Sequence, residues 1–222
     1  MKLKTKIILL LILILAFLYF LPQNLTEKTV YITVDSEGNE TEINNIFMTL
    51  EKNNISATFF VVGKTAETYP GLFREISEKN SVQCHTYSHV NLKKLSYEEQ
   101  KKEIEKSQEA VFKATGRNCT YFRPPFMKKN KNTEKILQEY KFLIFNDLNP
   151  IQSVFLSDYL IFKLKIPAKI YWKIISVLSH LKSETIVIIH PQITGSSEKN
   201  LNPFDEYISK LKEKNANFKI IK

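Results

Sequence analysis

Hydrophobic and polar residues alternate along the chain with two different periods. Residues 29–34 alternate with a period of two and are rich in β-branched side chains, which is typical of a half-buried strand. Over residues 40–52, by contrast, Ile43, Phe47 and Leu50 recur at the spacing of one helix face. This first part of the pattern therefore predicts a strand followed by a helix.

The succession of strand and helix repeats to the C-terminus. The pattern predicts seven strands, at 29–34, 57–62, 81–84, 120–123, 142–145, 185–189 and 218–221. It predicts helices at 40–52, 70–79, 97–115, 133–140, 157–181 and 204–214. Alternating strands and helices favour parallel pairing with right-handed crossovers, in either an open doubly wound sheet or a barrel. In both architectures the functional site lies at the C-terminal ends of the strands.

The first 22 residues have the features of an export signal. Three lysines precede an uninterrupted apolar run at 7–20, and positive charge before such a run stays in the cytoplasm. The run is shorter than the roughly 20 residues of a comfortable spanning helix, yet no small-residue cleavage site follows it. We expect an N-terminal hydrophobic helix that anchors the protein in the cytoplasmic membrane through residues 7–22. A cleaved signal peptide and a secreted protein are the alternative.

The rest of the chain is long enough for one folded domain. Of the 222 residues, 43% are hydrophobic and 12% aromatic, which lies within the range of globular proteins. We expect a signal segment at 1–22, a short linker at 23–28 and one extracytoplasmic domain at 29–222. The sequence leaves the oligomeric state open.

The formal net charge of +9 does little to identify a partner. Only three of the 32 basic residues are arginines, and the lysines are scattered along the chain. A nucleic-acid-binding protein more often shows clustered arginines interleaved with aromatic residues. We therefore expect no nucleic-acid partner.

Two cysteines, Cys84 and Cys119, allow one disulfide at most. An exported domain of this size does not need one, so we expect two buried free thiols. Cys84 directly precedes a histidine, but neighbouring side chains on a strand point to opposite faces. That alternation argues against Cys84 as a metal ligand.

Ionisable side chains follow most of the predicted strands. Because the C-terminal ends of parallel strands meet at one edge, we expect these side chains to converge. Three of only four histidines are among them, which chance placement of loop residues explains poorly. The residues concerned are Asp35, Glu37, His85, His89, Arg123, Asp147 and His190.

The segment His85-Thr-Tyr-Ser-His89 places two imidazoles four positions apart. One helical turn or a tight loop would direct both to a common point, as zinc or a similar divalent ion requires. An acidic third ligand from another strand would leave one coordination position open for water, which is the arrangement of a hydrolytic metal site. Taken alone, this spacing is weak evidence for a metal site, because it is more often found in two exposed loop histidines.

Five short motifs, in order along the chain, resemble those of the polysaccharide deacetylase family, also called the NodB homology domain or carbohydrate esterase family 4. The resemblance spans residues 29–221 and implies a distorted (β/α) barrel with fewer than eight units. The segments are TVDS at 33–36, similar to T-F-D-D; ATFFVVG at 57–63, similar to A-T-F-F-V-x-G; HTYSH at 85–89, similar to H-[ST]-x-x-H; FRPPF at 122–126, containing R-x-P-[YF]; and IVIIH at 186–190, similar to I-V-L-L-H.

The resemblance implies a role for each matching residue. Asp35 is expected to be the general base that deprotonates the attacking water, and Arg123 to keep Asp35 ionised and oriented. His85 and His89 are expected to bind a divalent metal, zinc above all, and His190 to be the general acid that protonates the leaving amine. A metal that polarises the acetyl carbonyl, a base beside it and an acid opposite together suit amide hydrolysis.

The match departs from the family pattern at two motifs. Ser36 stands where the opening motif has a second aspartate, and a neutral serine hydroxyl is a poor zinc ligand. We expect the Glu37 carboxylate to be the third ligand, with a water in that place or loss of the metal as alternatives. The fourth motif is reduced to Asp147, which is expected to orient His190. Substrate contacts are expected from Tyr87, Pro125 and Phe126, with Phe145 and Trp172 as further candidates for the apolar wall.

These observations together predict a membrane-anchored, metal-dependent hydrolase that removes N-acetyl groups from an amino-sugar polymer such as peptidoglycan or an exopolysaccharide. There are two rival interpretations. A glycan-binding pseudoenzyme would keep the fold without turnover, which Ser36 and the reduced fourth motif favour. A hydrolase of a non-carbohydrate amide would act on small amides, since the fold alone does not determine the substrate.

Overall fold

The computed structural model describes residues 29–145, 153–157, 184–191 and 202–221. In this part of the chain eight strands form one sheet, in the order β5-β4-β3-β2-β1-β7-β6, with β8 also paired to β1. Each of these pairings is parallel. The strands are β1 (Thr29–Ser36), β2 (Thr58–Val61), β3 (Ser81–Cys84), β4 (Tyr121–Phe122), β5 (Leu143–Ile144), β6 (Ser153–Ser157), β7 (Glu184–Ile189) and β8 (Asn217–Phe218).

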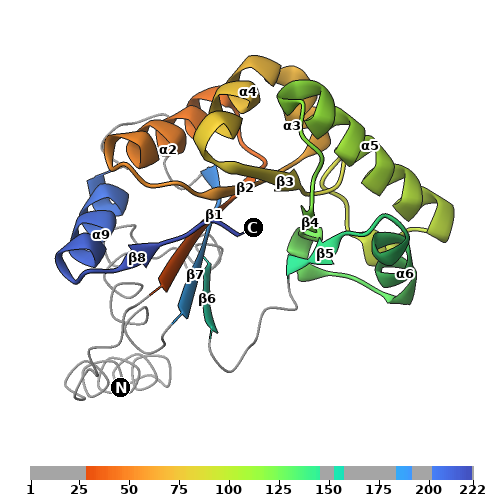
Figure 1. The fold of residues 1–222 in the computed structure, drawn as a ribbon. Coiled ribbons are helices and arrows are strands. Elements are labelled where there is room, and N and C mark those ends of the chain that lie inside the picture. Colours follow the sequence, from red (N-terminus) through yellow and green to blue (C-terminus); the bar gives the residue numbers. More distant parts are fainter. Residues whose placement is uncertain (1–28, 146–152, 158–183, 192–201, 222) are drawn as a thin grey trace, which may run out of the picture.

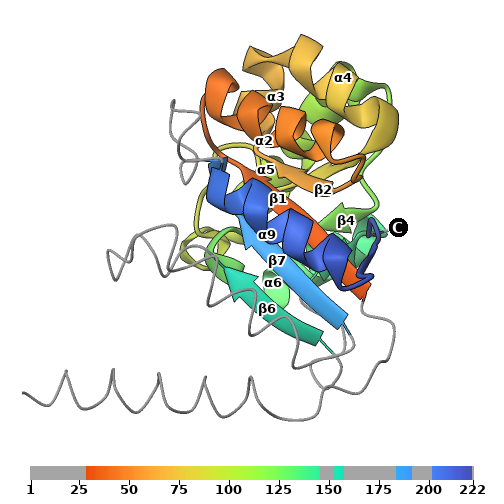
Figure 2. The same cartoon turned by 90° about the vertical axis from the view of Figure 1, so that its left-hand side faces the viewer.

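The sheet is curled, and the helices cover its outer face (Figures 1 and 2). They follow the curl from α9 at one end to α6 at the other (Figure 1). The α-helices are α2 (Glu40–Lys52), α3 (Gly63–Thr68), α4 (Pro70–Lys79), α5 (Tyr97–Thr115), α6 (Lys131–Glu139) and α9 (Asn202–Glu213), and two short 3₁₀ turns are η1 (Leu92–Lys94) and η2 (Pro125–Met127).

The predicted α/β class is confirmed, and the curled sheet decides between the two architectures that periodicity left open. All seven predicted strands are present, but the count was one short because β6 was missed. β6 forms a strand because it pairs with β7, and local periodicity in the sequence does not reveal such tertiary pairing. The six-residue helix α3 was also missed, because it is too short to show a helical period. The first residue of the helix predicted at 157–181 belongs instead to β6, and the rest of that prediction lies outside the described residues.

Two separate hydrophobic cores lie on the two faces of the sheet. On β1, Val30, Ile32 and Val34 belong to the large core that also contains the apolar faces of the helices. The smaller core lies inside the curl and contains Phe60 and Ile186, with Tyr31 of β1 packed against it. Because side chains alternate along a strand, the odd-numbered residues of β1 face the inside of the curl.

Capping residues determine where the helices on the functional side begin and end. Asn39 and Glu42 form a capping box at the start of α2, directly after the end of β1. Ser96 and Glu99 form another at the start of α5, as predicted from Ser96. Gly116 ends α5 with φ of 70°, a left-handed conformation that favours glycine. The loop before each capping box is therefore held close to a strand end.

The expectation of two free thiols was wrong: Cys84 and Cys119 form a disulfide, with their Cα atoms 5.8 Å apart. Cys84 ends β3 and lies opposite Phe122 of β4 in the sheet, so this pairing brings the chain before β4 alongside β3. The two cysteines are 35 residues apart in sequence. Their proximity depends on tertiary pairing, which spacing alone does not reveal.

No helix among the described residues is long and apolar enough to span a membrane. The predicted anchor at 1–22 and linker at 23–28 lie outside those residues.

The disulfide is expected to contribute substantially to stability. It closes a loop of 35 residues, and cross-links of this size typically stabilise a fold by about 3 kcal/mol. We expect Cys119→Ala to lower the free energy of unfolding by that amount in guanidinium titrations. Reductant should lower the stability of the wild type to that of the variant and leave the variant unchanged. Equal stability of variant and wild type without reductant would contradict the expectation.

Candidate active site

A buried ion pair between Asp35 and Arg123 lies at the centre of the candidate site. Asp35 is near the end of β1 and 6% exposed, while Arg123, directly after β4, is 0% exposed. Arg123 also donates from Nη2 to Thr33 Oγ1 at 2.9 Å. Its guanidinium lies between the rings of Phe60 and Phe145, 3.9 Å from each centroid. The arginine predicted to orient Asp35 is thus in direct contact with it.

The environment keeps Asp35 ionised. Burial alone raises its pKa, but the positive charge of Arg123 and the neighbouring His85 and His190 outweigh burial and hold the pKa below its usual value. A carboxylate that is ionised at neutral pH can accept a proton. This matches the predicted role of general base.

His85 is fixed in one tautomer. Its Nδ1 lies 2.6 Å from the backbone carbonyl oxygen of Arg123, to which it donates. Its Nε2 is buried, has no hydrogen-bond partner in the described part of the chain, and lies 3.8 Å from Asp35 Oδ2. Burial lowers the pKa of His85 to about 4, although Asp35 opposes the shift. The ring is therefore neutral, with a free lone pair on Nε2, as a metal ligand requires.

His89 and Glu37 form a second pair beside the first. His89 Nε2 lies 2.9 Å from Glu37 Oε2, and the His89 ring centroid is 5.1 Å from that of His85. The exposed ring of Phe126 lies 5.0 Å from His89 on another side. The hydrogen bond and charge of His89 lower the pKa of Glu37 although burial raises it. The carboxylate predicted as third metal ligand thus contacts one of the two predicted histidine ligands.

Alternation along β1 separates Ser36 from Asp35, and a turn then brings Glu37 to the histidines. Asp35 faces the inside of the curl, so Ser36, the last residue of β1, points to the opposite face. Glu37 lies past the strand, where its N–H donates to the Asp35 carbonyl oxygen at 3.0 Å and its carboxylate contacts His89. The Ser36 side chain is fully buried, and its hydroxyl has no hydrogen-bond partner among the described residues. Residues 35 and 37 therefore supply two carboxylates on one side of the strand end.

His190 approaches Asp35 from the neighbouring strand. It directly follows β7, which pairs with β1, and its Nε2 lies 3.8 Å from Asp35 Oδ2. Gly38 permits this arrangement, because a Cβ at that position would lie 2.7 Å from Pro191 Cβ. The predicted general acid is thus brought to the same carboxylate as His85.

The loop that carries His89 is held by hydrogen bonds to Glu103 of α5. Glu103 accepts hydrogen bonds from the backbone N–H groups of Tyr87 and Ser88, at 3.1 and 2.9 Å, and from the Ser88 hydroxyl at 2.8 Å. Sequence reasoning missed Glu103, and it also missed Thr33 and Phe60, which hold Arg123. No local sequence pattern marks these three residues. Their role becomes visible only from the strand register and the packing of α5.

Backbone strain is concentrated at the candidate site. Seven of the described non-glycine residues have positive φ, and four of them, Thr86, His89, Phe126 and Met127, lie in the two loops of the site. Such conformations cost about 1–3 kcal/mol each and persist only where the surrounding structure enforces them. The strain is consistent with loops whose shape serves a function.

Some predicted residues lie elsewhere. The Tyr87 ring fills the space above Gly63, and its hydroxyl donates to Glu67 at 2.9 Å, so it faces α3 and α5 and not the histidines. Phe145, a candidate for the apolar wall, is instead stacked on Arg123. Pro125 is buried, and Phe126 is 57% exposed beside His89. Asp147 and Trp172 lie outside the described residues.

The donor set fits a divalent metal ion of the zinc type. Among the described residues, no three His, Cys, Asp or Glu side chains are grouped tightly enough, as they stand, to hold an ion. The buried Nε2 of His85 nevertheless has no hydrogen-bond partner among the described residues, and His89, in contact with Glu37, lies beside the His85 ring. Two imidazoles and a carboxylate are typical zinc ligands.

Comparison with known proteins identifies relatives of this chain. Residues 23–144, more than half of the chain, match the family model for polysaccharide deacetylase. The peptidoglycan-N-acetylglucosamine deacetylase PgdA of Listeria monocytogenes is 37% identical over 111 residues, which are 50% of this chain and 24% of that protein. The chain therefore spans about a quarter of the Listeria protein. The peptidoglycan-N-acetylglucosamine deacetylase of Bacillus cereus is 28% identical over 212 residues, 91% of this chain and 70% of that protein.

Solved structures share the fold. The Bc1960 peptidoglycan N-acetylglucosamine deacetylase matches with a TM-score of 0.72 and 27% identity, over 90% of this chain and 88% of that one. A carbohydrate esterase family 4 pseudoenzyme from Bacillus anthracis matches with a TM-score of 0.71 and 22% identity, over 90% of this chain and 65% of that one. At this lower identity the likeness shows the fold alone.

The buried neutral His85 predicts how stability depends on pH. Its pKa is about 4 in the folded protein against an ordinary value of 6.5, so between these values the unfolded state binds more protons. The free energy of unfolding should therefore fall as pH is lowered from 6.5 towards 4. We expect His85→Asn to show a weaker dependence in guanidinium titrations with a chelator present. An unchanged dependence in the variant would refute this assignment.

Proposed function

This chain belongs to the polysaccharide deacetylase family, and we propose that it is a hydrolase that removes N-acetyl groups from the amino sugars of peptidoglycan. The observation that carries the proposal is the ionised Asp35 carboxylate, held by buried Arg123 and approached at 3.8 Å by both His85 and His190. Relatives named as peptidoglycan deacetylases in Listeria and Bacillus support the choice of substrate.

We assign the two proton transfers to Asp35 and His190, which lie next to each other beside the proposed acetamide position. Asp35 accepts a proton from the attacking water, because Arg123 keeps it ionised. His190 donates a proton to the nitrogen as the amide bond breaks, so that the sugar leaves as an amine and the acetyl group as acetate. Phe126, exposed next to His89, provides an apolar wall for the acetyl methyl group.

We assign the metal to Glu37, His85 and His89, with zinc as the preferred ion. When bound, it would polarise the acetyl carbonyl and lower the pKa of a water molecule. The hydrogen bond from His85 Nδ1 to the Arg123 carbonyl supports this assignment. It fixes the His85 tautomer that leaves Nε2 free to bind a metal. The Glu37–His89 contact places the proposed third ligand next to the second.

A glycan-binding pseudoenzyme is the second candidate, and one observation favours it. Ser36 replaces a metal-binding aspartate of the family motif, and its buried hydroxyl faces away from the histidines. If Glu37 does not replace that aspartate as a metal ligand, the site would bind glycan without turnover.

We also propose that residues 7–22 anchor the protein in the cytoplasmic membrane, which would place the domain next to its substrate.

The proposal predicts which substitutions abolish the release of acetate. With zinc added, the full chain in detergent should release acetate from peptidoglycan. We expect Asp35→Asn to lower kcat by about 100-fold or more, the usual range for losing a general base. Glu37→Gln should lower both kcat and the zinc content of the purified protein. Glu40→Gln, an exposed carboxylate on α2, is the matched control and should change neither.

Two results would argue against this proposal. A folded, zinc-loaded wild type that binds glycan but releases no acetate would support the pseudoenzyme. A Glu37→Gln variant that keeps its zinc would remove Glu37 from the ligand set. Unfolding curves of each variant separate these results from loss of the fold.

A further inference from the structure

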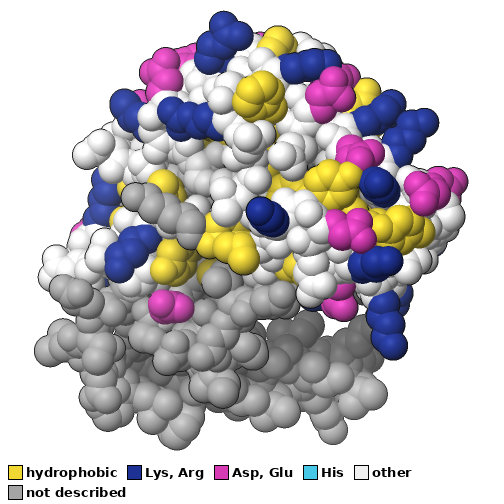
Figure 3. Space-filling view, turned by 45° about the vertical axis from the view of Figure 1, so that its right-hand side comes forward, with side chains coloured by type: hydrophobic (Ala, Val, Ile, Leu, Met, Phe, Trp, Pro, Cys, Tyr) yellow, Lys and Arg dark blue, Asp and Glu magenta, His cyan; other side chains and the backbone are white. Residues whose placement is uncertain are grey.

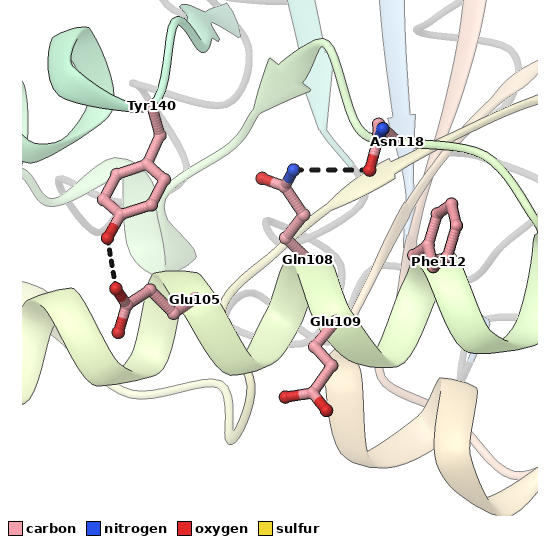
Figure 4. Close-up of a pocket in the computed structure, with 6 residues that line it drawn as sticks. All are labelled: Glu105, Gln108, Glu109, Phe112, Asn118 and Tyr140. Carbon is pink, nitrogen blue, oxygen red and sulfur yellow. Dashed lines mark hydrogen bonds between the residues drawn. The ribbon is translucent and has the colours of Figure 1, made fainter.

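A second hollow lies on the outer side of the molecule, between α5 and the end of α6 (Figure 4). Its volume is about 280 Å³, just below the roughly 300–1,000 Å³ of pockets for drug-sized ligands. That size suits one small ring. The lining residues are Glu105, Gln108, Glu109, Phe112, Asn118 and Tyr140.

The hollow is separate from the candidate active site. The active-site residues lie at the C-terminal ends of the strands and inside the curl, whereas the hollow lies on α5, outside the sheet (Figure 1). Figure 3 looks towards the side of the molecule where α5 and α6 lie, and it shows hydrophobic, acidic and basic side chains interspersed, with no histidine on view. A ligand in the hollow would therefore not touch the catalytic groups.

Two aromatic rings mark the two ends of the hollow. Phe112 is 48% exposed although its side chain is apolar, and Tyr140 stands opposite it at the end of α6 (Figure 4). Exposed aromatic rings offer a flat surface for the C–H face of a sugar ring or for a cation. The spacing of Glu105, Gln108 and Phe112 along α5 places them on one face of the helix.

Between the rings, the side chains present mainly hydrogen-bond acceptors. Tyr140 donates its hydroxyl to Glu105, and this hydrogen bond raises the pKa of Tyr140 to about 12, so the donor is already in use. The Gln108 amide N–H points to Asn118 Oδ1, at 3.5 Å. Its own Oε1 is buried, has no hydrogen-bond partner, and points towards the Tyr140 side of the hollow (Figure 4). The acceptors that a ligand can reach are the exposed carboxylates of Glu105 and Glu109, so a suitable ligand must bring hydrogen-bond donors to them.

The charge of the hollow favours a positively charged ligand. Glu109 is paired with Lys113 at 2.7 Å, so its charge is largely balanced. In the described part of the chain, the Glu105 carboxylate has only the neutral Tyr140 hydroxyl as a partner. A glycan carrying free carboxylates or phosphates would be repelled here. An amino sugar without its acetyl group offers an ammonium, several hydroxyls and an apolar ring face.

We propose that the hollow on α5 is a secondary binding site for one deacetylated amino-sugar unit of a glycan, that is, for the product of the reaction. The proposal rests on the proposed function, since deacetylation creates the free amine. Product units bound there would keep the enzyme on a polymer that it has begun to modify. The chain as a whole has a formal charge of +9 and would repel a cationic glycan, so binding of such a glycan requires a local site.

The test compares three glycans of equal length that differ only at one position of the sugar. Calorimetry measures the binding of each glycan to the full chain in detergent, at a pH where the amine is protonated. The three glycans are a glucosamine hexamer, its fully N-acetylated form and a glucose hexamer. We expect the glucosamine hexamer to bind most tightly. Phe112→Ala should weaken this binding about tenfold. Glu105→Gln should abolish the preference for the free amine.

A control variant and an activity assay separate this site from the active site. Glu98→Gln removes an exposed carboxylate from the same helix outside the hollow and should leave binding unchanged. Phe112→Ala should keep the rate of acetate release from a short N-acetylated substrate. Because calorimetry needs no turnover, failure of the deacetylase assay would not affect this result.

Two results would overturn the proposal. The first is equal affinity of wild type and Phe112→Ala for the glucosamine hexamer. The second is binding of the glucose hexamer as tightly as the glucosamine hexamer, which would remove the role of the ammonium. Unfolding curves of Phe112→Ala serve as a check, and the exposed position of this residue predicts a near-native stability.

Discussion

The buried ion pair between Asp35 and Arg123 is the interaction on which the rest of the site depends. Two charges removed from water cost several kcal/mol each, and the cost is offset only when the geometry is good and the remaining hydrogen-bonding groups are satisfied. Here Thr33 accepts from the guanidinium, and the rings of Phe60 and Phe145 enclose it. The pair therefore requires β1, β2, β4 and the chain after β5 to meet inside the curl.

The order of the strands places the surrounding side chains next to this ion pair. β1 lies between β2 and β7, so Asp35 faces Phe60 on one side and His190 approaches on the other. β4 consists of only two residues and shares one paired position with β3, at Cys84 and Phe122. The disulfide from Cys84 to Cys119 reinforces this short junction, from which both His85 and Arg123 emerge.

Helix α5 links the two sites discussed above without joining them. Near its N-terminus, Glu103 holds the loop that carries His89. Beginning at Glu105, the outer face of the same helix lines the second hollow. A ligand in the hollow would rest on a helix that is already fixed by its capping box at Ser96 and by Gly116 at its end.

The sequence by itself determined most of the order of strands and helices, the ends of helices such as α5, and the candidate residues that follow the strands. Period-two and helical patterns predicted seven of the strands, and the motifs around Asp35, His85 and Arg123 placed the site at the strand ends, because these signals are local. Only the tertiary structure decided the curl of the sheet, the disulfide, the place of β6 and the stacking of Phe145 on Arg123. Those features depend on strand register between segments far apart in the chain, and a one-residue change of register would reverse the face on which each side chain lies.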